Sequence, residues 1–478
     1  MSTSITFALI ASYFLFLIAI SFFTGKNATN DAFFSANKKS PWYLVAFGMI
    51  GASLSGVTFI SVPGWVENSS FSYMQVVFGY ILGYLVIGTI LLPLYYKMNL
   101  TSIYGYLESR FGYYSYKTGA SFFIISRLIG ASFRLFLVAN VFQLFLFDAL
   151  GIEFWQTVTI TIILIWLYTF KSGIKTIIWT DSLQTLFMLI ALGVTITQVS
   201  NELNLSLSSL TSFIDDSSYS KIFYFSDFSS SNFFWKQFLS GAFIAIVMTG
   251  LDQDMMQKNL TCKNLKDAQK NMFWFTIVLT VVNFIFLILG LLLTEYAQSN
   301  GLDIHKDNLF PILAKDYLGP SVFIFFLLGL IAAAYSSADS ALTSLTTSFS
   351  IDIIDLEKKY DKLKQEKLRK RIHVLMSLVL ILIIISFKYL IKNESVIERL
   401  FVFAGYTYGP LLGYYSFGLF TRYKIQDNIS PLIALIAPIL SYCISLFFKT
   451  QFAFEFGFFI LILNGSLMFL GLFCIKKT

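Results

Sequence analysis

The sequence predicts an all-α polytopic membrane protein with about 13 transmembrane helices. Of its 478 residues, 56% are hydrophobic and only 13% are charged, which is more apolar than a soluble domain of this length requires. The apolar residues fall into separate stretches of about 20 residues, the length that crosses a bilayer as a helix. The basic residues gather in alternate loops, as they do when a chain crosses a membrane repeatedly.

The apolar stretches set the order of the expected helices. The first seven lie at roughly Ile5–Phe23, Tyr43–Gly64, Tyr73–Tyr95, Thr118–Leu146, Phe154–Phe170, Thr176–Ile196 and Phe233–Leu251. The other six lie at roughly Met272–Leu293, Val322–Phe349, Val374–Leu390, Val396–Phe420, Pro431–Phe448 and Phe454–Ile475. The first stretch lacks a basic leader and a small-residue cleavage site, so we interpret it as a helix and not as a signal peptide. Pro410 should bend the eleventh helix, because proline removes a helix hydrogen bond.

The loop charges predict the topology. Most of the 34 Lys and Arg residues lie in one alternate set of loops, including the eight basic residues of 358–371. The positive-inside rule then places the N-terminus outside and the C-terminus in the cytoplasm, in a multi-pass protein of the cell's inner membrane. The net charge of +7 reflects this topology and does not indicate nucleic-acid binding. Within 352–371, an amphipathic helix at the lipid surface and a solvated linker both remain open.

Cysteine and histidine usage argues against an enzyme. Cys262, Cys443 and Cys474 show no paired spacing, and His305 and His373 lie in predicted loop or helix-end positions. We expect neither a disulfide framework nor a metal cluster or catalytic triad from these residues. No nucleophile and base stand together elsewhere, so no enzymatic chemistry and no resident cofactor are expected.

The ninth stretch places hydroxyls and a carboxylate inside an otherwise apolar helix. Its serines at 336, 340, 344 and 348 repeat every four residues and therefore share one face, with Asp339 beside them. Polar groups are costly in hydrocarbon and usually face a cavity or a partner. Oxygen-only ligands of this kind suit a small hard cation such as sodium.

Several strings on the predicted cytoplasmic side are specific in composition and order. They are Asp31–Phe34, Thr101–Gly112, Trp179–Gln184, Asp252–Leu260 followed by Lys266–Gln269, and Ser336–Ser340. In this order among the helices they resemble the sodium:solute symporter family, whose members import proline, sugars, sialic acid, pantothenate or carboxylates with sodium. The resemblance covers nearly the whole chain.

The resemblance implies a leucine-transporter-like fold in one transmembrane domain, 1–478. Two inverted five-helix repeats would occupy 41–200 and 232–420, with an extra helix and loop at 1–40 and two further helices at 429–478. The sequence itself shows no residue-level repeat between the two halves. In transporters with such repeats, interrupted helices form the binding site near the bilayer midplane.

The resemblance also implies a sodium site between the second and ninth helices. Its ligands would be the backbone carbonyls of Gly51, Leu54 and Ala333 and the hydroxyls of Ser336 and Ser337. The glycines and serines of 48–56 suit this role, because they weaken a regular helix and would free carbonyls for a cation. Close helix packing through small residues is the alternative.

A second sodium would, by the same resemblance, be held by Asp181, Asp339 and Ser340. Asp339 stands where family members can have a serine, and this departure leaves the geometry of the second site and the sodium stoichiometry open. In the alternative interpretation, Asp181 caps or anchors a helix and Asp339 pairs with a basic group.

Arg134 is the residue that bears most on the solute. It lies mid-helix in the fourth stretch, where a guanidinium is costly unless it is paired or hydrated. Its fork matches a carboxylate, and the resemblance to sialic-acid symporters implies a substrate-binding role. An internal salt bridge is the alternative, with Asp181 as a candidate partner, whereas Arg127 is expected to be a structural ion-pair partner.

Further candidates for the substrate site are Ser55, Thr58, Gln75 and Phe78. For each of them ordinary packing is the alternative interpretation. Asp252, Gln253 and Asp254 end a predicted helix at the cytoplasmic face and are interpreted as structural or inner-gate residues.

Together these features predict a sodium-coupled symporter that imports a small polar organic solute, with a carboxylate such as sialic acid favoured. A sodium/sugar or sodium/amino-acid symporter, a sensor of the same fold and a channel are the alternatives. The expected partners are sodium, the solute and the lipid bilayer, with no nucleic acid. The sequence leaves the oligomeric state open.

Overall fold

The computed structural model describes residues 3–25, 29–170, 173–390 and 396–477, and this part of the chain contains helices and no β-strand. The first ten helices are α1 (Thr3–Thr24), α2 (Asn30–Ser35), α3 (Trp42–Ser53), α4 (Gly56–Ser69), α5 (Tyr73–Val86), α6 (Leu92–Lys97), α7 (Gly105–Arg110), α8 (Tyr113–Phe142), α9 (Phe154–Thr169) and α10 (Ile174–Glu202). The next are α11 (Leu207–Asp216), α12 (Phe234–Ala245), α13 (Gln253–Asn259), α14 (Leu265–Ser299), α15 (Leu309–Asp316) and α16 (Gly319–Ser348). The last are α17 (Leu356–Lys359), α18 (Lys362–Leu390), α19 (Val396–Phe420), α20 (Ser430–Phe452) and α21 (Ile460–Cys474).

The predicted class, an all-α polytopic membrane protein, is confirmed. Among the described residues, 8 helical stretches are long and apolar enough to cross a membrane, and 9 if the bent pair Phe234–Gly250 and Gln253–Asn259 counts as one span. Shorter apolar helices, such as α3 and α9, accompany them.

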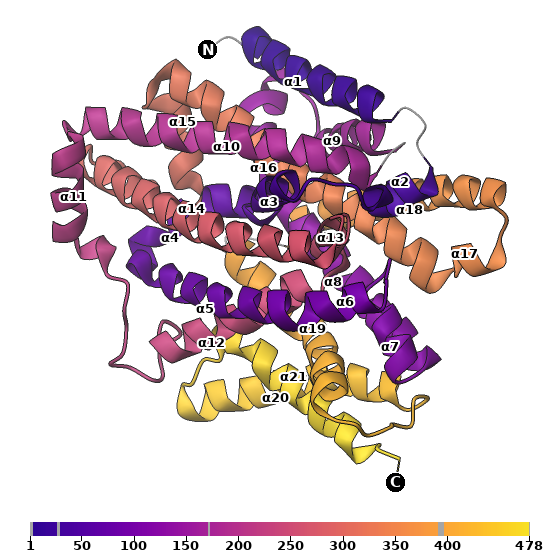
Figure 1. The fold of residues 1–478 in the computed structure, drawn as a ribbon. Helices are drawn as coiled ribbons and strands as arrows, with labels where there is room; N and C mark the ends of the chain where they lie inside the picture. The colour runs from indigo at the N-terminus through magenta and orange to yellow at the C-terminus, as the bar shows by residue number, and fades with distance from the viewer. Residues whose placement is uncertain (1–2, 26–28, 171–172, 391–395, 478) are drawn as a thin grey trace.

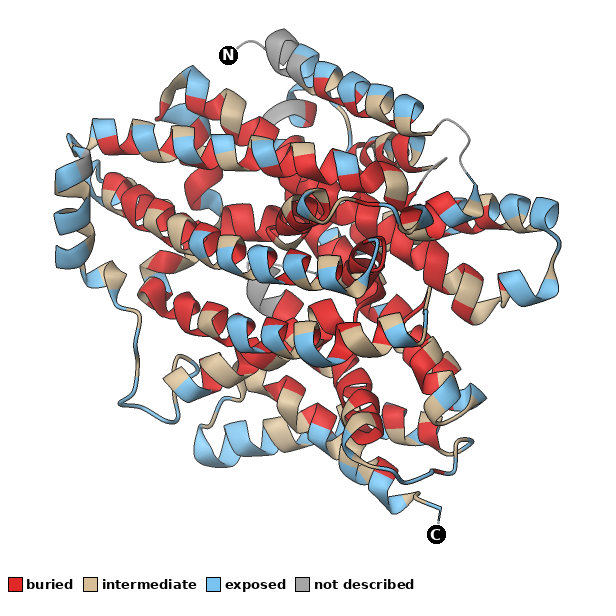
Figure 2. Ribbon diagram, viewed as in Figure 1, coloured by how far each residue is buried: buried red, intermediate tan, exposed pale blue. Residues whose placement is uncertain are grey.

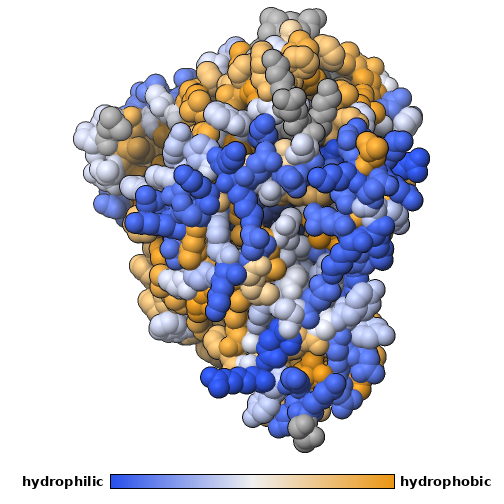
Figure 3. Space-filling view, turned by 45° about the vertical axis from the view of Figure 1, so that its right-hand side comes forward, coloured by the Kyte–Doolittle hydropathy of each residue, from blue (hydrophilic) through white to orange (hydrophobic). Residues whose placement is uncertain are grey.

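The long helices run side by side across the view of Figure 1, and the buried residues concentrate where they meet (Figure 2). In the centre, α10 packs against α16 and α3, and α5 packs against α12. Helices α2, α7 and α17 lie together at one end, and Figure 3 shows hydrophilic side chains gathered on this face. The opposite end carries α11 and the long loop that follows it.

Two helices at the centre are broken. Helix α3 ends at Ser53, Leu54 leaves helical geometry (φ −79°, ψ 66°), and α4 begins at Gly56 after the extended Ser55. The expected helix 43–64 is therefore two helices, as its small residues suggested. The second break separates α12 from α13, which meet at an angle of 68°. There Asp252 caps α13 by accepting hydrogen bonds from the amides of Asp254 (2.8 Å) and Met255 (3.4 Å).

Two segments expected to be loops contain helix. The basic segment 362–371 forms the first turns of α18, which continues directly into the apolar part of that helix. Lys, Glu, Gln, Leu and Arg are strong helix formers, and this composition favours extension of the span beyond its apolar part. The Ser-rich segment after α10 likewise contains α11, which Ser206 caps. Helix α19 remains one helix through Pro410.

Candidate functional site

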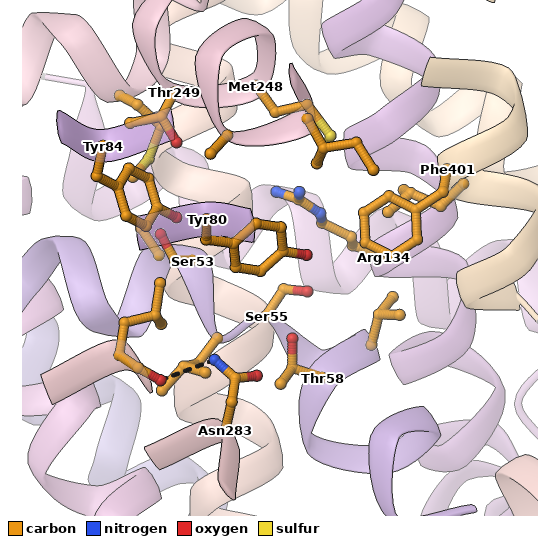
Figure 4. A pocket seen from close by; sticks show the side chains of 18 of the residues that line it. Ser53, Ser55, Thr58, Tyr80, Tyr84, Arg134, Met248, Thr249, Asn283 and Phe401 are labelled. Carbon is orange, nitrogen blue, oxygen red and sulfur yellow. Dashed lines mark hydrogen bonds between the residues drawn. The ribbon is translucent and has the colours of Figure 1, made fainter. Parts of the chain in front are cut away.

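A cavity of about 80 Å³ lies beside the break between α3 and α4 (Figure 4). Helices α5, α8, α14 and α19 and the end of α12 supply its other walls. Its polar and aromatic lining comprises Ser53, Ser55, Thr58, Tyr73, Tyr80, Tyr84, Arg127, Arg134, Thr249, Asn283 and Phe401. Of the predicted substrate residues, the structure brings Ser55, Thr58 and Arg134 together here.

Arg134 points from α8 into this cavity (Figure 4). Its side chain is only 9% exposed, and its Nε has no hydrogen-bond partner. Among the described residues it forms no ion pair, so the alternative of a salt bridge with Asp181 is wrong. Asp181 pairs instead with Lys258. The cavity thus contains a desolvated cation that forms no ion pair with any carboxylate among the described residues.

Arg127, two turns from Arg134 on α8, has the structural role that was expected. Its guanidinium bonds to Asp254 and lies 3.9 Å from Asp252, and both carboxylates are buried. The hydroxyl of Tyr408 on α19 donates to Asp252. This network ties α8 and α19 to the break between α12 and α13, where it forms one wall of the cavity. Gln253 links the same break to the turn before α7, because it accepts from the amide of Ile103.

Sequence reasoning missed the tyrosines of α5. Tyr73, Tyr80 and Tyr84 line the cavity from one helical face, and the hydroxyls of the first two lie 3.1 Å apart. Their spacing of seven and four residues is a signal that was available in the sequence. Gln75, two residues from Tyr73, lies about 200° further round the helix and therefore faces elsewhere.

Gln75 and Phe78 contact the long loop between α11 and α12, and neither is among the residues that line the cavity. The fully buried Gln75 donates to the carbonyl of Asn232 (3.0 Å) and accepts from the amide of Tyr224 (3.1 Å). Phe78 stacks on Phe223, with ring centroids 6.1 Å apart. The expectation that Gln75 contacts solute is therefore corrected to loop anchoring, and Phe78 has the packing role that its alternative interpretation described.

Gln75→Leu is expected to lower stability by about 1 kcal/mol, because it removes two hydrogen bonds to a part-buried amide and carbonyl of the loop. Solute affinity of the folded protein should stay unchanged. Thermal unfolding and solute binding of the purified variant check both expectations, with the half-exposed Gln198→Leu as the control. If Gln75→Leu lowers the affinity for solute tenfold and leaves stability intact, Gln75 belongs to the substrate site.

The residues predicted for the first sodium site lie on or beside α3 and on α16, two helices that pack against each other. Gly51 lies in the last turn of α3, whose final carbonyls have no partner within the helix, and Leu54 is its C-cap. The hydroxyl of Ser337 donates to the carbonyl of Ala52 (3.3 Å), which joins the two helices. The fully buried Ser336 lies near Asp181, yet its hydroxyl makes no hydrogen bond of normal geometry. One of the predicted hydroxyls, that of Ser337, is therefore placed beside the carbonyls at the end of α3.

The candidate second site has a different character. Asp181 accepts from Ser340 (3.4 Å), but its Oδ2 also lies 2.6 Å from the Nζ of Lys258. Asp339 accepts from the hydroxyl of Tyr168 (3.0 Å) and has no basic group within 4.0 Å among the described residues. The structure thus brings the three predicted residues together and adds a lysine that was not predicted.

Broken helices that meet at a central cavity, inside a bundle of apolar spans, define a secondary transporter. The chain belongs to the sodium:solute symporter family, whose model matches residues 33–423. It is therefore a sodium-coupled symporter of a membrane and not an enzyme.

Curated relatives cover most of the chain. The sodium/sialic acid symporter NanT of Aliivibrio fischeri is 24% identical over 438 residues, which are 87% of this chain and 83% of the relative. The sodium/sialic acid symporter SiaT of Proteus mirabilis is 21% identical over 441 residues, with 87% and 85% covered. The human sodium-coupled monocarboxylate transporter 1 is 24% identical over 436 residues, with 88% and 69% covered.

Solved structures share the fold. A sodium-coupled sialic acid symporter in a substrate-bound, outward-open state superposes with a TM-score of 0.83 at 18% identity, over 98% of both chains. Mhp1, a nucleobase-cation-symport-1 family transporter in a closed conformation, gives a TM-score of 0.55 at 14% identity, over 93% of both chains.

Proposed function

We propose that this protein imports a small organic carboxylate together with sodium across the cell's inner membrane, with sialic acid as the first candidate. The observation that carries the proposal is the guanidinium of Arg134 in the cavity, whose Nε has no hydrogen-bond partner and which forms no ion pair within the described part of the chain. A buried charge without a partner is strongly unfavourable, so the site favours an anion that can complete it. A carboxylate meets the planar fork with two parallel hydrogen bonds.

The rest of the lining suits a polyhydroxylated body attached to that carboxylate. Ser55, Thr58 and Asn283 offer hydroxyl and amide groups, while the tyrosines of α5 combine a flat apolar face with a hydroxyl. Several relatives are named as sialic acid or monocarboxylate transporters, which agrees with an anionic solute. A sodium/sugar or sodium/amino-acid symporter remains the second candidate, because hydroxyls and amides also bind neutral sugars.

We further propose thirteen spans arranged as two inverted five-helix repeats, 41–200 and 232–420, within one domain. The two broken helices, α3–α4 and α12–α13, then occupy corresponding positions as the first helix of each repeat. The basic end with α2, α7 and α17 would face the cytoplasm, which places the N-terminus outside and the C-terminus inside. Sodium at the carbonyls of Gly51, Leu54 and Ala333 and the hydroxyls of Ser336 and Ser337 would order the break beside the cavity and raise its affinity for solute.

Competition for uptake tests the solute class. Proteoliposomes containing the purified protein take up labelled sialic acid in the presence of unlabelled carboxylates, neutral sugars and amino acids. Carboxylates are expected to compete and neutral sugars to fail. Competition by neutral sugars alone would replace the proposal with its second candidate.

Ser336→Ala and Ser337→Ala are each expected to raise the sodium concentration for half-maximal uptake, because each removes a proposed ligand. Ser344→Ala is the matched control on the same stripe of α16, since its hydroxyl already donates to the carbonyl of Ala341 (3.0 Å). Sodium titrations of uptake, with choline as the replacement ion, measure the effect. Unchanged sodium dependence in both variants would remove these hydroxyls from the site.

A further inference from the structure

Lys258 is a fully buried lysine, 1% exposed, on the short helix α13. The break after α12 turns the chain by 68° and carries α13 against α10 and α16. This placement brings the Nζ of Lys258 to 2.6 Å from Oδ2 of Asp181 on α10. A lysine in such a position is unusual, because an ammonium is costly to bury unless its charge is compensated.

Other polar groups gather around the carboxylate that this ammonium meets. Asp181 Oδ2 also accepts from Ser340 (3.4 Å), and the carboxamide of Gln184, in the orientation that satisfies its bonds, donates to Oδ1 (3.2 Å). Ser336 contributes a buried hydroxyl without a partner of normal geometry near the same carboxylate. Hydroxyl and carboxamide groups thus gather around the Asp181 carboxylate, and the positive charge that this carboxylate meets is supplied by the chain itself.

We propose that the ammonium of Lys258 is a tethered cation that takes the place of a second sodium at Asp181, so that the protein binds one sodium ion. The inference rests on the proposed sodium site at the break between α3 and α4. A sodium ion at Asp181 would face the ammonium at close range, and their mutual repulsion in a buried, low-dielectric site is strong. Displacing the ammonium would leave it buried without its partner, since solvent does not reach it.

Asp339 fits the same account. Its Oδ2 accepts from Tyr168 (3.0 Å) and its Oδ1 accepts from the amide of Ser340 (2.6 Å). Lys258 also lies close enough to act electrostatically on Asp339. The ammonium therefore bonds to Asp181, which links α13 to α10, and acts on Asp339 only at longer range.

The consequence for transport concerns net charge. One sodium carried with a solute of one negative charge moves no net charge across the membrane, whereas two sodium ions would move one positive charge. Uptake of a monocarboxylate should therefore respond to the sodium gradient and show no response to a potential imposed with potassium and valinomycin.

Equilibrium binding of ²²Na to the purified protein, without solute, tests the proposal directly. Wild type is expected to bind one sodium ion with a Hill coefficient near one. Lys258→Met vacates Asp181 and is expected to bind a second sodium ion. Lys258→Arg keeps a tethered cation and should bind one sodium ion, as wild type does. Lys258→Met combined with Asp181→Asn removes both the cation and its carboxylate, so this double variant should also bind one sodium ion.

Two sodium ions bound to wild type would overturn the proposal, as would a folded Lys258→Met protein that still binds one. If Lys258→Met does not fold, the wild-type number decides alone, and the double variant shows whether the loss came from an unpaired Asp181. Because solute is absent, failure of the proposed transport function stays separate: it would appear as sodium binding without sodium-dependent uptake.

Discussion

Arg134→Ala is expected to weaken binding of the anionic solute by about 30-fold to several thousand-fold, which corresponds to about 2–5 kcal/mol. The guanidinium lies in the cavity with no partner among the described residues, so the solute carboxylate would be its counter-ion. Truncation leaves that carboxylate unpaired in a desolvated cavity. Solute affinity measured by calorimetry on purified, folded protein tests the expectation.

Arg134→Lys is the control variant, because it keeps the positive charge and loses the planar shape of the guanidinium. It should also bind poorly, because an ammonium cannot reproduce the planar fork. Stability of Arg134→Ala is expected to match wild type or exceed it, since removing a buried charge without an ion-pair partner relieves the protein of a desolvation cost. Retained affinity for the native solute in Arg134→Ala would remove this residue from the substrate site and, with it, the reason to favour an anion.

Arg127→Ala is expected to show the opposite pattern and to lower stability by about 3–5 kcal/mol. Its guanidinium bonds to Asp254 and faces Asp252, so truncation leaves two buried carboxylates without their cation. Thermal unfolding in detergent measures the loss. Arg110→Ala is the comparison, because this part-buried arginine bonds only to the carbonyls of Gly418 and Thr421.

Adding Asp254→Asn to Arg127→Ala should recover part of the lost stability, because it removes one of the orphaned charges. A stable Arg127→Ala protein with weakened solute binding would contradict the structural role and place both arginines in the substrate site. The two residues share one helix and one cavity, so this comparison separates binding from structure within one element.

The sequence predicted the features that depend on local chemistry. Glycines and serines of 48–56 predicted a weakened helix, and the structure breaks it at Leu54; the serines of α16 predicted a shared polar face, and the structure buries it against neighbouring helices. The position of Arg134 in the middle of a span predicted that it is buried. Each of these conclusions follows from one segment read alone, where periodicity and the cost of polar groups in hydrocarbon decide the result.

The features that the sequence did not reveal depend on contacts between distant segments. Lys258 reaches Asp181 because a bend redirects α13, and nothing within either helix encodes that meeting. Asp181 was named as a candidate partner of Arg134 because the sequence alone does not show which distant charged residues meet. The error over Gln75 was of another kind. A step of two residues along α5 places a side chain on the opposite face of the helix, so Gln75 does not share the face of Tyr73. The spacing of the α5 tyrosines was the better indication of which face lines the cavity. The basic segment before the tenth span formed helix because its residues favour helix whether or not lipid surrounds them.

The most direct test of this account is solute uptake into proteoliposomes under an imposed inward sodium gradient. The account predicts that labelled sialic acid accumulates transiently above its equilibrium level, and that dissipating the gradient or replacing sodium with choline abolishes the accumulation. Equal uptake with and without the gradient would contradict sodium coupling. Saturable binding of the solute with no accumulation would indicate a sensor that retains the transporter fold.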